Sequence, residues 1–340
     1  MAAAARRMRD LIDRAKTLGP IRLAVVGAGQ GLVLDGVQQA ESLGLVEPCL
    51  IGNAREIADL AEKHGWDPSI ACIAPVDGES DQAKAGARLV RERRVDALMK
   101  GHVHTDMLMR VLLDEANGLR IPGHRASHAI VAEIPSYPKL LCITDAALNI
   151  SPDLNAKGQI LRNAAEVTRA LGIQTAKAAV LSAVETVNPA ISSTIDAAAL
   201  TLMGRRGQIP GILIDGPLGF DNAISAAAAK VKGIASEVSG NADIILVPDL
   251  VSGNILVKTL EYLAGATLAG VVVGLATPVI LTSRADPVAG RVASIALAVL
   301  LYKSHVLNAV SPPAEVDFGR HVAPQPEAAC RPLVDMTISK

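Results

Sequence analysis

The sequence predicts an α/β protein in which mostly parallel strands form sheets with helices on both faces. Short apolar runs alternate with helical patterns along most of the 340 residues, which is the pattern of such sheets. Half of the residues are hydrophobic but only 2% are aromatic, so Ala, Val, Leu and Ile must build the core. Such a core suits buried parallel strands packed against Ala-rich helices. No repeat of ~20–50 residues is visible, which excludes a solenoid.

Each predicted strand is a short apolar run. The strands are expected at residues 21–26, 49–51, 70–74, 97–99, 129–134, 140–144, 178–181, 212–214, 244–247, 271–273 and 279–281. Helical patterns lie between most of them, at residues 81–94, 105–115, 157–171, 194–205, 253–263 and 288–302. Met8, Leu11, Ile12 and Ala15 recur at helical spacing, so a surface helix is also expected within residues 1–18.

Charge and cysteine content narrow the class of protein. With a net charge of −1, the chain has no excess of positive charge that would indicate binding to nucleic acid or to an anionic membrane. The four cysteines are far apart and form no CxxC pair, which argues against a zinc site and against a disulfide framework. No secretory signal is visible, so we expect a cytoplasmic protein.

One uncharged stretch imitates a membrane span. Residues 262–281 carry no charged side chain over about 20 positions, which is close to the length that crosses a bilayer. The stretch contains Gly265, Gly270, Gly274 and Pro278, and its second half is β-branched. We therefore predict the end of a helix, a strand, a short turn and a second strand, and no membrane helix.

The first loop, residues 27–31, follows a strand and precedes a helix, as a dinucleotide-binding fingerprint does. Leu32 occupies the place of the third glycine, and the second strand ends in Gly52 and Asn53 instead of an acid that could bind a ribose. A set of turn glycines or a local phosphate contact is therefore favoured over NAD binding.

Residues 100–128 form the most basic local region. Arginine offers a bidentate fork for phosphate, and a helix N-terminus adds aligned N–H groups. His102 and His104 could instead hold a metal, but no HExxH pattern supports one, so we predict anion binding and no metal. The residues expected to contact phosphate or a related anion are His102, His104, Thr105, Arg110, Arg120, Arg125, Ser127 and His128.

Polar residues also follow the later predicted strands. The residues expected to bind substrate there are Asp145, Asn149, Asp215, Gly216, Pro217, Asp221 and Asn254. Because carboxyl ends of parallel strands meet at one edge of a sheet, these residues are expected to face one crevice. Taken singly, each aspartate could instead cap a helix or form a turn.

The stretch at residues 277–291 carries the densest chemistry. An apolar run is followed by Ser283, Arg284 and Asp286, and a helical pattern resumes at Val288. A hydroxyl, a guanidinium and a carboxylate within four residues can hold an anion and move a proton. The alternative is that Asp286 caps the helix, with Pro287 at its first position.

The order of these motifs resembles one enzyme family. KGHVHTD, GLR…SH, TDAALNISPD, DGPLGFDNAIS, ADIILVPDLVSGN and VILTSRADP occur in sequence over roughly two thirds of the chain. They are similar to the phosphate acetyltransferase and phosphate butyryltransferase family, and most similar to its butyryl branch. The resemblance implies a two-domain α/β/α fold like that of isocitrate and isopropylmalate dehydrogenases, with an interdomain cleft. Residues 1–145 with 287–340 would form the first domain, and residues 146–286 the second.

The resemblance also implies an activity: the reversible conversion of acyl-CoA and phosphate to acyl phosphate and CoA, by direct attack in a ternary complex. CoA would be a substrate, no cofactor would be bound, and a homodimer or higher homo-oligomer is expected. Ser283 and Arg284 match the catalytic pair of the acetyl branch. The aspartate of that branch falls at Gly290 here, so Asp286 or one of His102, His104 and His128 must accept the proton.

Two other functions remain open from the sequence. A nicotinamide-dependent decarboxylating dehydrogenase can share this fold, and it would need aspartates from the region 215–249 to bind a divalent metal. A non-catalytic relative is permitted by the glycine at position 290.

Overall fold

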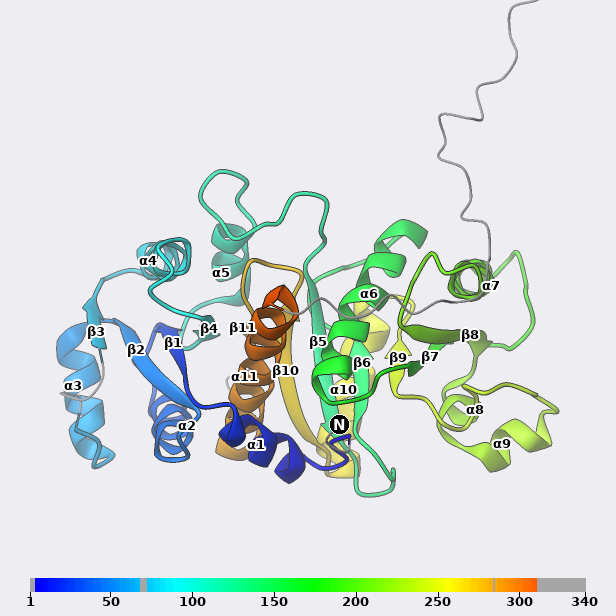
Figure 1. Ribbon diagram of the computed structural model, residues 1–340, viewed down its shortest axis with the longest axis horizontal. Helices are drawn as coiled ribbons and strands as arrows, with labels where there is room; N and C mark the ends of the chain where they lie inside the picture. Colours follow the sequence, from blue (N-terminus) through cyan, green and yellow to red (C-terminus); the bar gives the residue numbers. More distant parts are fainter. Residues whose placement is uncertain (1–3, 68–71, 284, 311–340) are drawn as a thin grey trace, which may run out of the picture.

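The structure, a computed structural model, describes residues 4–67, 72–283 and 285–310. Eleven strands form one sheet in the order β3-β2-β1-β4-β11-β10-β5-β6-β9-β7-β8 (Figure 1). The strands are β1 (Ile21–Val26), β2 (Val46–Gly52), β3 (Cys72–Pro75), β4 (Ala97–Lys100), β5 (Ser127–Glu133), β6 (Leu141–Thr144), β7 (Ala176–Leu181), β8 (Ile212–Leu218), β9 (Ile244–Leu246), β10 (Thr267–Val273) and β11 (Val279–Ile280). The predicted α/β class is confirmed. The Pro-rich tail from Ser311 lies outside the described residues.

Helices cover both faces of this sheet. They are α1 (Met8–Thr17), α2 (Gly31–Ser42), α3 (Ala54–Lys63), α4 (Glu79–Arg91), α5 (Thr105–Leu112), α6 (Leu154–Ala170), α7 (Ser192–Arg205), α8 (Phe220–Ile224), α9 (Ala226–Val231), α10 (Leu250–Ala264) and α11 (Val288–Val310). Helix α1 buries Met8, Leu11 and Ala15, as its periodicity predicts.

The uncharged stretch folds as predicted. Helix α10 ends at Ala264, the left-handed Gly265 (φ +64°) stops it, and β10 and β11 then pair antiparallel. None of the described helices is long and apolar enough to cross a membrane.

The sheet reverses its polarity at the middle. Strands β1, β2, β3, β4 and β11 run parallel to one another, and β6, β9, β7 and β8 do the same. The pairings β11–β10, β10–β5 and β5–β6 between these two sets are all antiparallel. The carboxyl ends of the two sets therefore lie at opposite edges of the sheet. The polar ends of β6, β9 and β8 therefore share one edge, as expected, but the end of β11, which Ser283 follows, lies at the opposite edge.

The apolar core differs between the two faces of the sheet. On one face a single buried cluster runs under α1, α2, α6, α7 and α11. On the other face the cluster under α4 and α5 is separate from the cluster under α8 and α10. The region between these two clusters lies over β10 and β5, where the sheet reverses.

Helix α11 fixes the middle of the sheet from the continuous face. Its residues 292–301 are almost all buried, and it packs against β10, α1 and α2. Ser294 accepts a hydrogen bond from the Gly270 N–H at 3.0 Å and donates one to the Gly290 carbonyl at 2.7 Å. The segment between β11 and α11 is therefore held between two rigid elements.

Candidate active site

The segment from Leu281 to Pro287, here called the serine loop, begins at the carboxyl end of β11. The Ser283 N–H donates to Asp286 Oδ2 at 2.7 Å, and the Ser283 carbonyl accepts from the Asp286 N–H at 3.2 Å. The Ser283 side chain is exposed. The first helical hydrogen bond of α11 runs from the Arg291 N–H to the Pro287 carbonyl. The carboxylate of Asp286 thus closes the loop on Ser283, and the helix begins two residues later, at Val288.

Arg291 holds the same loop from the inside. Arg291 is buried, with 1% of its surface exposed. Its Nη1 donates to Thr282 Oγ1 at 2.9 Å, and its Nη2 donates to the Ser283 carbonyl at 3.0 Å. Ser283 is therefore fixed through its N–H by Asp286 and through its carbonyl by Arg291. Sequence reasoning selected Arg284, which lies outside the described residues, and did not select Arg291. The sequence does mark Arg291 as unusual, because it is the one charged residue in the apolar run from Val288 to Leu301.

Burial dominates the electrostatics of the serine loop. It raises the pKa of Asp286 above its ordinary value, against the hydrogen bond from Ser283, which lowers it. The charge of Glu261 on α10 raises the pKa of Asp286 further. Burial also lowers the pKa of Arg291, while the charge of Asp286 opposes that change. A carboxylate with a raised pKa in the loop and a fixed cation at the start of α11 therefore lie close together.

A cavity of about 370 Å³ lies beside the serine loop, lined by the end of α10, the start of β10 and Asp286 with Pro287. On α10, Lys258 Nζ lies 2.7 Å from Glu261 Oε2. Burial lowers the pKa of Lys258, but the hydrogen bond and charge of Glu261 outweigh it, so the pKa is raised overall. This pair brings a second charged element to the loop.

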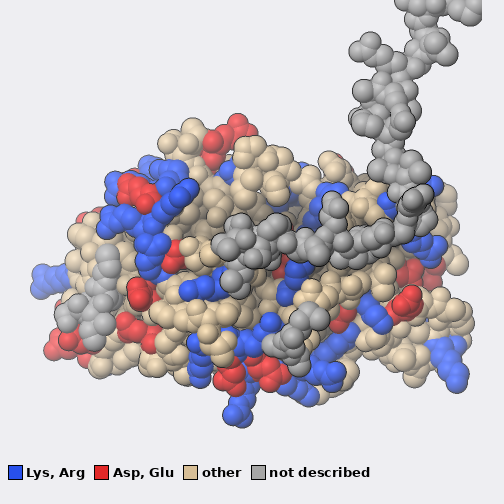
Figure 2. Space-filling model, viewed as in Figure 1, with Lys and Arg blue, Asp and Glu red and all other residues tan. Residues whose placement is uncertain are grey.

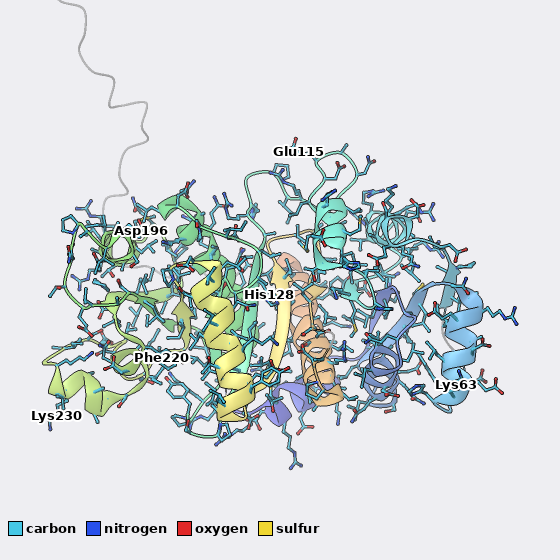
Figure 3. The ribbon with its side chains drawn as sticks, turned by 180° about the vertical axis from the view of Figure 1, so that it is seen from behind. Lys63, Glu115, His128, Asp196, Phe220 and Lys230 are labelled. Atoms are coloured by element: carbon cyan, nitrogen blue, oxygen red, sulfur yellow. The ribbon has the colours of Figure 1, made fainter. Side chains whose placement is uncertain are left out.

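His128 lies on β5, in the middle of the molecule between α10 and β10 (Figure 3). It is 5% exposed, and neither ring nitrogen has a well-formed hydrogen bond among the described residues. The backbone of Leu281, which opens the serine loop, is the group that the ring approaches. Burial lowers the pKa of His128, and the charge of Asp145 opposes this. Of the predicted histidines, His128 is the one that the fold places under the serine loop.

A polar network anchors the backbone below His128. The Asp145 carboxylate accepts from the N–H groups of His128, Ala147 and Leu148 and from Asn149 Nδ2. Arg125 Nη1 donates to Asn149 Oδ1 at 3.0 Å. Asp145 and Asn149 therefore order a turn.

Ser127 points to the opposite face of β5, where Asn163 donates to its hydroxyl at 2.8 Å.

The two histidines at residues 102–104 do not form a metal pair. His102 is exposed, and its N–H donates to the Gly27 carbonyl at 2.6 Å. His104 Nδ1 lies 2.9 Å from both oxygens of Glu79, and Thr105 then begins α5. Among the residues that the structure describes, no three potential metal ligands gather.

The remaining basic candidates separate. Arg110 is exposed on α5 and lines a cavity between α4 and α5. Arg120 makes an ion pair with Glu115 at 2.8 Å. In the first loop, a Cβ placed on Gly29 would lie 2.8 Å from the Glu56 carboxylate. A carboxylate at that place repels the pyrophosphate of a dinucleotide, which agrees with the preference against NAD.

Asp215, Gly216, Pro217 and Asp221 lie away from the serine loop. They belong to β8 and α8, and β10, β5, β6, β9 and β7 separate β8 from β11. At ~4.8 Å per strand this distance is roughly 30 Å along the sheet, and the loops leave opposite edges. Asp221 pairs with Lys232 at 2.9 Å. The structure therefore does not bring these residues to Ser283.

A second cavity, of about 540 Å³, lies at the carboxyl ends of β7 and β9. It is lined by Phe220 from the DGPLGFD motif, Asp249 from the VPDLVSGN motif and Lys157. Lys157 makes an ion pair with Asp196 at 2.6 Å. Asp249 caps α10 by accepting from the Ser252 N–H, and Asp153 caps α6 in the same way. Asn254 follows as the fifth residue of α10 and is exposed.

Comparison with known proteins gives these motifs an identity. A family profile described as phosphate acetyl/butaryl transferase matches residues 76–299, which is more than half of the chain. The chain belongs to this family. The phosphate acetyltransferase of Rickettsia felis is 45% identical over 300 residues, covering 88% of this chain and 86% of its own. The phosphate butyryltransferase of Clostridium acetobutylicum is 39% identical over 292 residues, covering 86% and 97%.

Solved structures agree with the fold of the phosphate acetyl/butyryl transferase family. A branched-chain phosphotransacylase from Enterococcus faecalis superposes with a TM-score of 0.73 at 29% identity, covering 83% of this chain and 99% of its own. The dehydrogenase-like α/β fold implied by the sequence resemblance is thereby confirmed.

Proposed function

We propose that this protein is a phosphate acyltransferase that converts short-chain acyl-CoA and phosphate to acyl phosphate and CoA, and the reverse. The observation that carries the proposal is the fixed serine loop. Asp286 and Arg291 hold the backbone of Ser283 on both sides while its hydroxyl stays exposed. Membership of the phosphate acetyl/butyryl transferase family supports this reaction.

The reaction needs no covalent enzyme intermediate. In the direction of acyl-CoA formation, the CoA sulfur attacks the carbonyl carbon of the acyl phosphate. The S–C bond forms, the C–O bond to phosphate breaks, and the thiol proton passes to a base. The carbonyl oxygen gains negative charge on the way, so a hydrogen-bond donor at that point lowers the barrier.

The residues of the serine loop suit these steps. The Ser283 N–H is already bonded to Asp286, so the hydroxyl is the donor that remains for the oxyanion or for phosphate. The buried positive charge of Arg291 favours an anion in front of the loop. Arg284, by sequence, would clamp the phosphate with its guanidinium fork.

The proton acceptor is assigned first to Asp286. A thiol has a pKa of ~8.5, and an unperturbed aspartate at ~3.9 is a poor match for it. Burial raises the pKa of Asp286 and improves the match. His128, held neutral by burial beneath Leu281, is the alternative acceptor.

One assay separates this function from its alternatives. Phosphorolysis of acetyl-, propionyl- and butyryl-CoA should release free thiol only when phosphate is present. Reduction of NAD or NADP with 2-hydroxy acids, run beside it, should be absent. Nicotinamide reduction without phosphorolysis would establish a dehydrogenase, and inactivity in both assays would establish a non-catalytic relative.

The larger organisation is proposed on separate grounds. The split of the apolar core on one face supports two lobes. The bounds, residues 1–145 with 287–340 for one lobe and 146–286 for the other, rest on the sequence resemblance, because each cluster holds residues from both ranges. Val251, Ile255 and Tyr262 expose 60%, 61% and 66% of their surface on α10, which supports a homodimer. Light scattering during gel filtration measures the mass of the assembly and so tests the dimer.

The free buried thiols of Cys49 and Cys142 suit a cytoplasmic location.

A further inference from the structure

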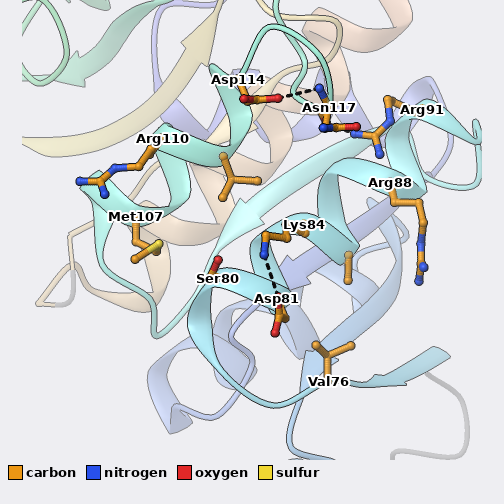
Figure 4. A pocket seen from close by; sticks show the side chains of 12 residues that line it. Val76, Ser80, Asp81, Lys84, Arg88, Arg91, Met107, Arg110, Asp114 and Asn117 are labelled. Carbon is orange, nitrogen blue, oxygen red and sulfur yellow. Dashed lines mark hydrogen bonds and ion pairs between the residues drawn. The ribbon is translucent and has the colours of Figure 1, made fainter.

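A cavity of about 800 Å³ lies in the groove between α4 and α5, away from the serine loop. Figure 4 shows Lys84 at its middle, Arg88 and Arg91 toward one end, and Arg110 toward the other. Such a volume lies within the range of ~300–1,000 Å³ that takes a drug-sized or cofactor-sized ligand. A single orthophosphate would leave most of this space empty.

The charge of the groove is positive although the whole chain carries a net charge of −1. Four cations line it against two carboxylates, Asp81 and Asp114. Lys84 pairs with Asp81 at 3.0 Å, while Arg110 makes no ion pair with any residue that the structure describes. Figure 2 shows basic side chains gathered over α4. The groove therefore attracts an anion.

The positions of the cations suit several phosphate groups. Lys84, Arg88 and Arg91 are spaced i, i+4 and i+7, so they follow one face of α4 over ~10 Å. Arg110 reaches the groove from α5 on the other side. Arginine binds phosphate oxygens through two parallel N–H groups, so separate phosphates can be bound along this length.

The groove also has an apolar wall. Val76 and Val111, partly buried, pack on the core cluster under α4 and α5, and Ala85 and Met107 complete the wall. An apolar surface beside a row of cations fits a ligand that carries a flat base as well as phosphates. Leu281, which opens the serine loop, belongs to the same cluster.

We propose that the groove between α4 and α5 binds a nucleoside polyphosphate, with its phosphates on Lys84, Arg88, Arg91 and Arg110 and its base on the apolar wall. Two ligands carry this chemistry. One is the nucleotide end of CoA, with a 3′-phosphate and a 5′-diphosphate on adenosine, and this source rests on the proposed function. The other is a free nucleotide.

Direct binding tests the groove without any turnover. Adenosine 3′,5′-bisphosphate and ATP are titrated into the full chain by calorimetry, at 50 and 200 mM salt. The double variant Arg88→Gln/Arg91→Gln should bind each ligand ~10-fold or more weakly, because two charge-assisted contacts are lost. The matched control is Arg93→Gln with Arg94→Gln, which removes the same charge beyond the end of α4 and outside the groove. The control should bind within about twofold of the unchanged protein.

Two results overturn the proposal. One is that neither ligand binds at millimolar concentration. The other is that both double variants bind equally well, because binding would then reflect the general charge of this surface. Either result leaves the proposed acyltransferase function standing, since phosphorolysis is measured separately.

Kinetics then identifies the source of the nucleotide. If the ligand is CoA itself, CoA should be preferred to dephospho-CoA, and the Arg88/Arg91 variant should lose that preference. Adenosine 3′,5′-bisphosphate should also compete with CoA. If the ligand is a free nucleotide, ATP should bind and change the rate without competing with CoA. Both results support the groove as a nucleotide site.

Discussion

Single residues decide the chemistry of the serine loop through their backbone contacts. Asp286 accepts from the Ser283 N–H, and Arg291 donates to the Ser283 carbonyl. A loop held through both backbone groups of one residue loses little freedom when it binds substrate, so the exposed hydroxyl is already in place. Three substitutions test this arrangement.

Ser283→Ala should fold normally and lose ~10²-fold or more in kcat, because the hydroxyl is the remaining donor for the oxyanion. The backbone contacts of Ser283 do not involve its side chain, so the melting temperature should stay unchanged. A kcat within threefold of the unchanged protein would remove Ser283 from the mechanism.

Asp286→Asn separates proton transfer from loop geometry. The asparagine oxygen can still accept from the Ser283 N–H, so the loop should keep its shape. If Asp286 is the base, kcat should fall and the acid limb of the pH–rate profile should disappear. That limb should lie above the ordinary range of an aspartate, because burial raises the pKa of Asp286. An unchanged kcat and pH profile would move the assignment to His128.

Arg291→Met tests the buried cation as a positioning residue. It should raise the KM for phosphate and lower kcat, and it should shift the acid limb to higher pH, because the Arg291 charge lowers the pKa of Asp286. Arg291→Lys should restore the charge but only one hydrogen bond, and so rescue partly. The control is Ser294→Ala, a buried change on the same helix without contact to Ser283. If Ser294→Ala alters KM and pH profile equally, Arg291 acts only on stability.

At the scale of elements, β10 is the strand that organises the site. It pairs antiparallel with both β5 and β11, and it carries Gly270 where His128 and Leu281 approach. A side chain at this position would meet the Leu281 carbonyl at 2.7 Å and His128 Nε2 at 3.1 Å. The glycine is therefore needed for a close approach, not for an unusual backbone angle.

Gly270→Ala should destabilise the protein by ~1–3 kcal/mol, because overpacking must push the backbone of Leu281 away. Activity should fall with it, since Leu281 opens the serine loop. Gly158→Ala on α6 is the matched control: its new Cβ finds atoms no closer than 3.5 Å, so it should be neutral or stabilise by up to ~1 kcal/mol. Chemical denaturation of both variants measures this, and equal stabilities would contradict the close approach.

At the scale of the whole molecule, the reversal of the sheet places a neutral histidine at its centre. Burial lowers the pKa of His128, so the folded chain resists a proton that the unfolded chain accepts at ~6.5. The stability that His128 contributes is thus present above this pH and is lost as the pH falls below it.

His128→Gln should therefore flatten the pH dependence of stability between pH 7.5 and pH 5.5. The unchanged protein should lose at most ~1.4 kcal/mol per pH unit from this one group in the acid part of that range. Denaturant unfolding at several pH values measures the difference between the two proteins. Parallel curves would show that His128 takes up its proton as readily in the folded chain.

Much of the fold could be predicted because it depends on local patterns. Alternating apolar runs and helical periodicity specify elements such as β1, α6 and the turn from α10 to β10, since their residues are neighbours along the chain. The serine loop was also recognisable, because Ser283 and Asp286 interact over three residues. The family motifs made the reaction class recognisable in the same way.

Only the tertiary structure decided which of the polar strand ends meet. The direction of β5 and β10 depends on pairing between segments far apart in sequence, and this pairing sends the second set of strand ends to the opposite edge. That reversal separates Asp215 and Asp221 from Ser283, and it brings His128 beneath Leu281. The role of Arg291 could not be predicted for a related reason. A charge in an apolar helix has a role only through the loop that it contacts, and the sequence does not show that contact.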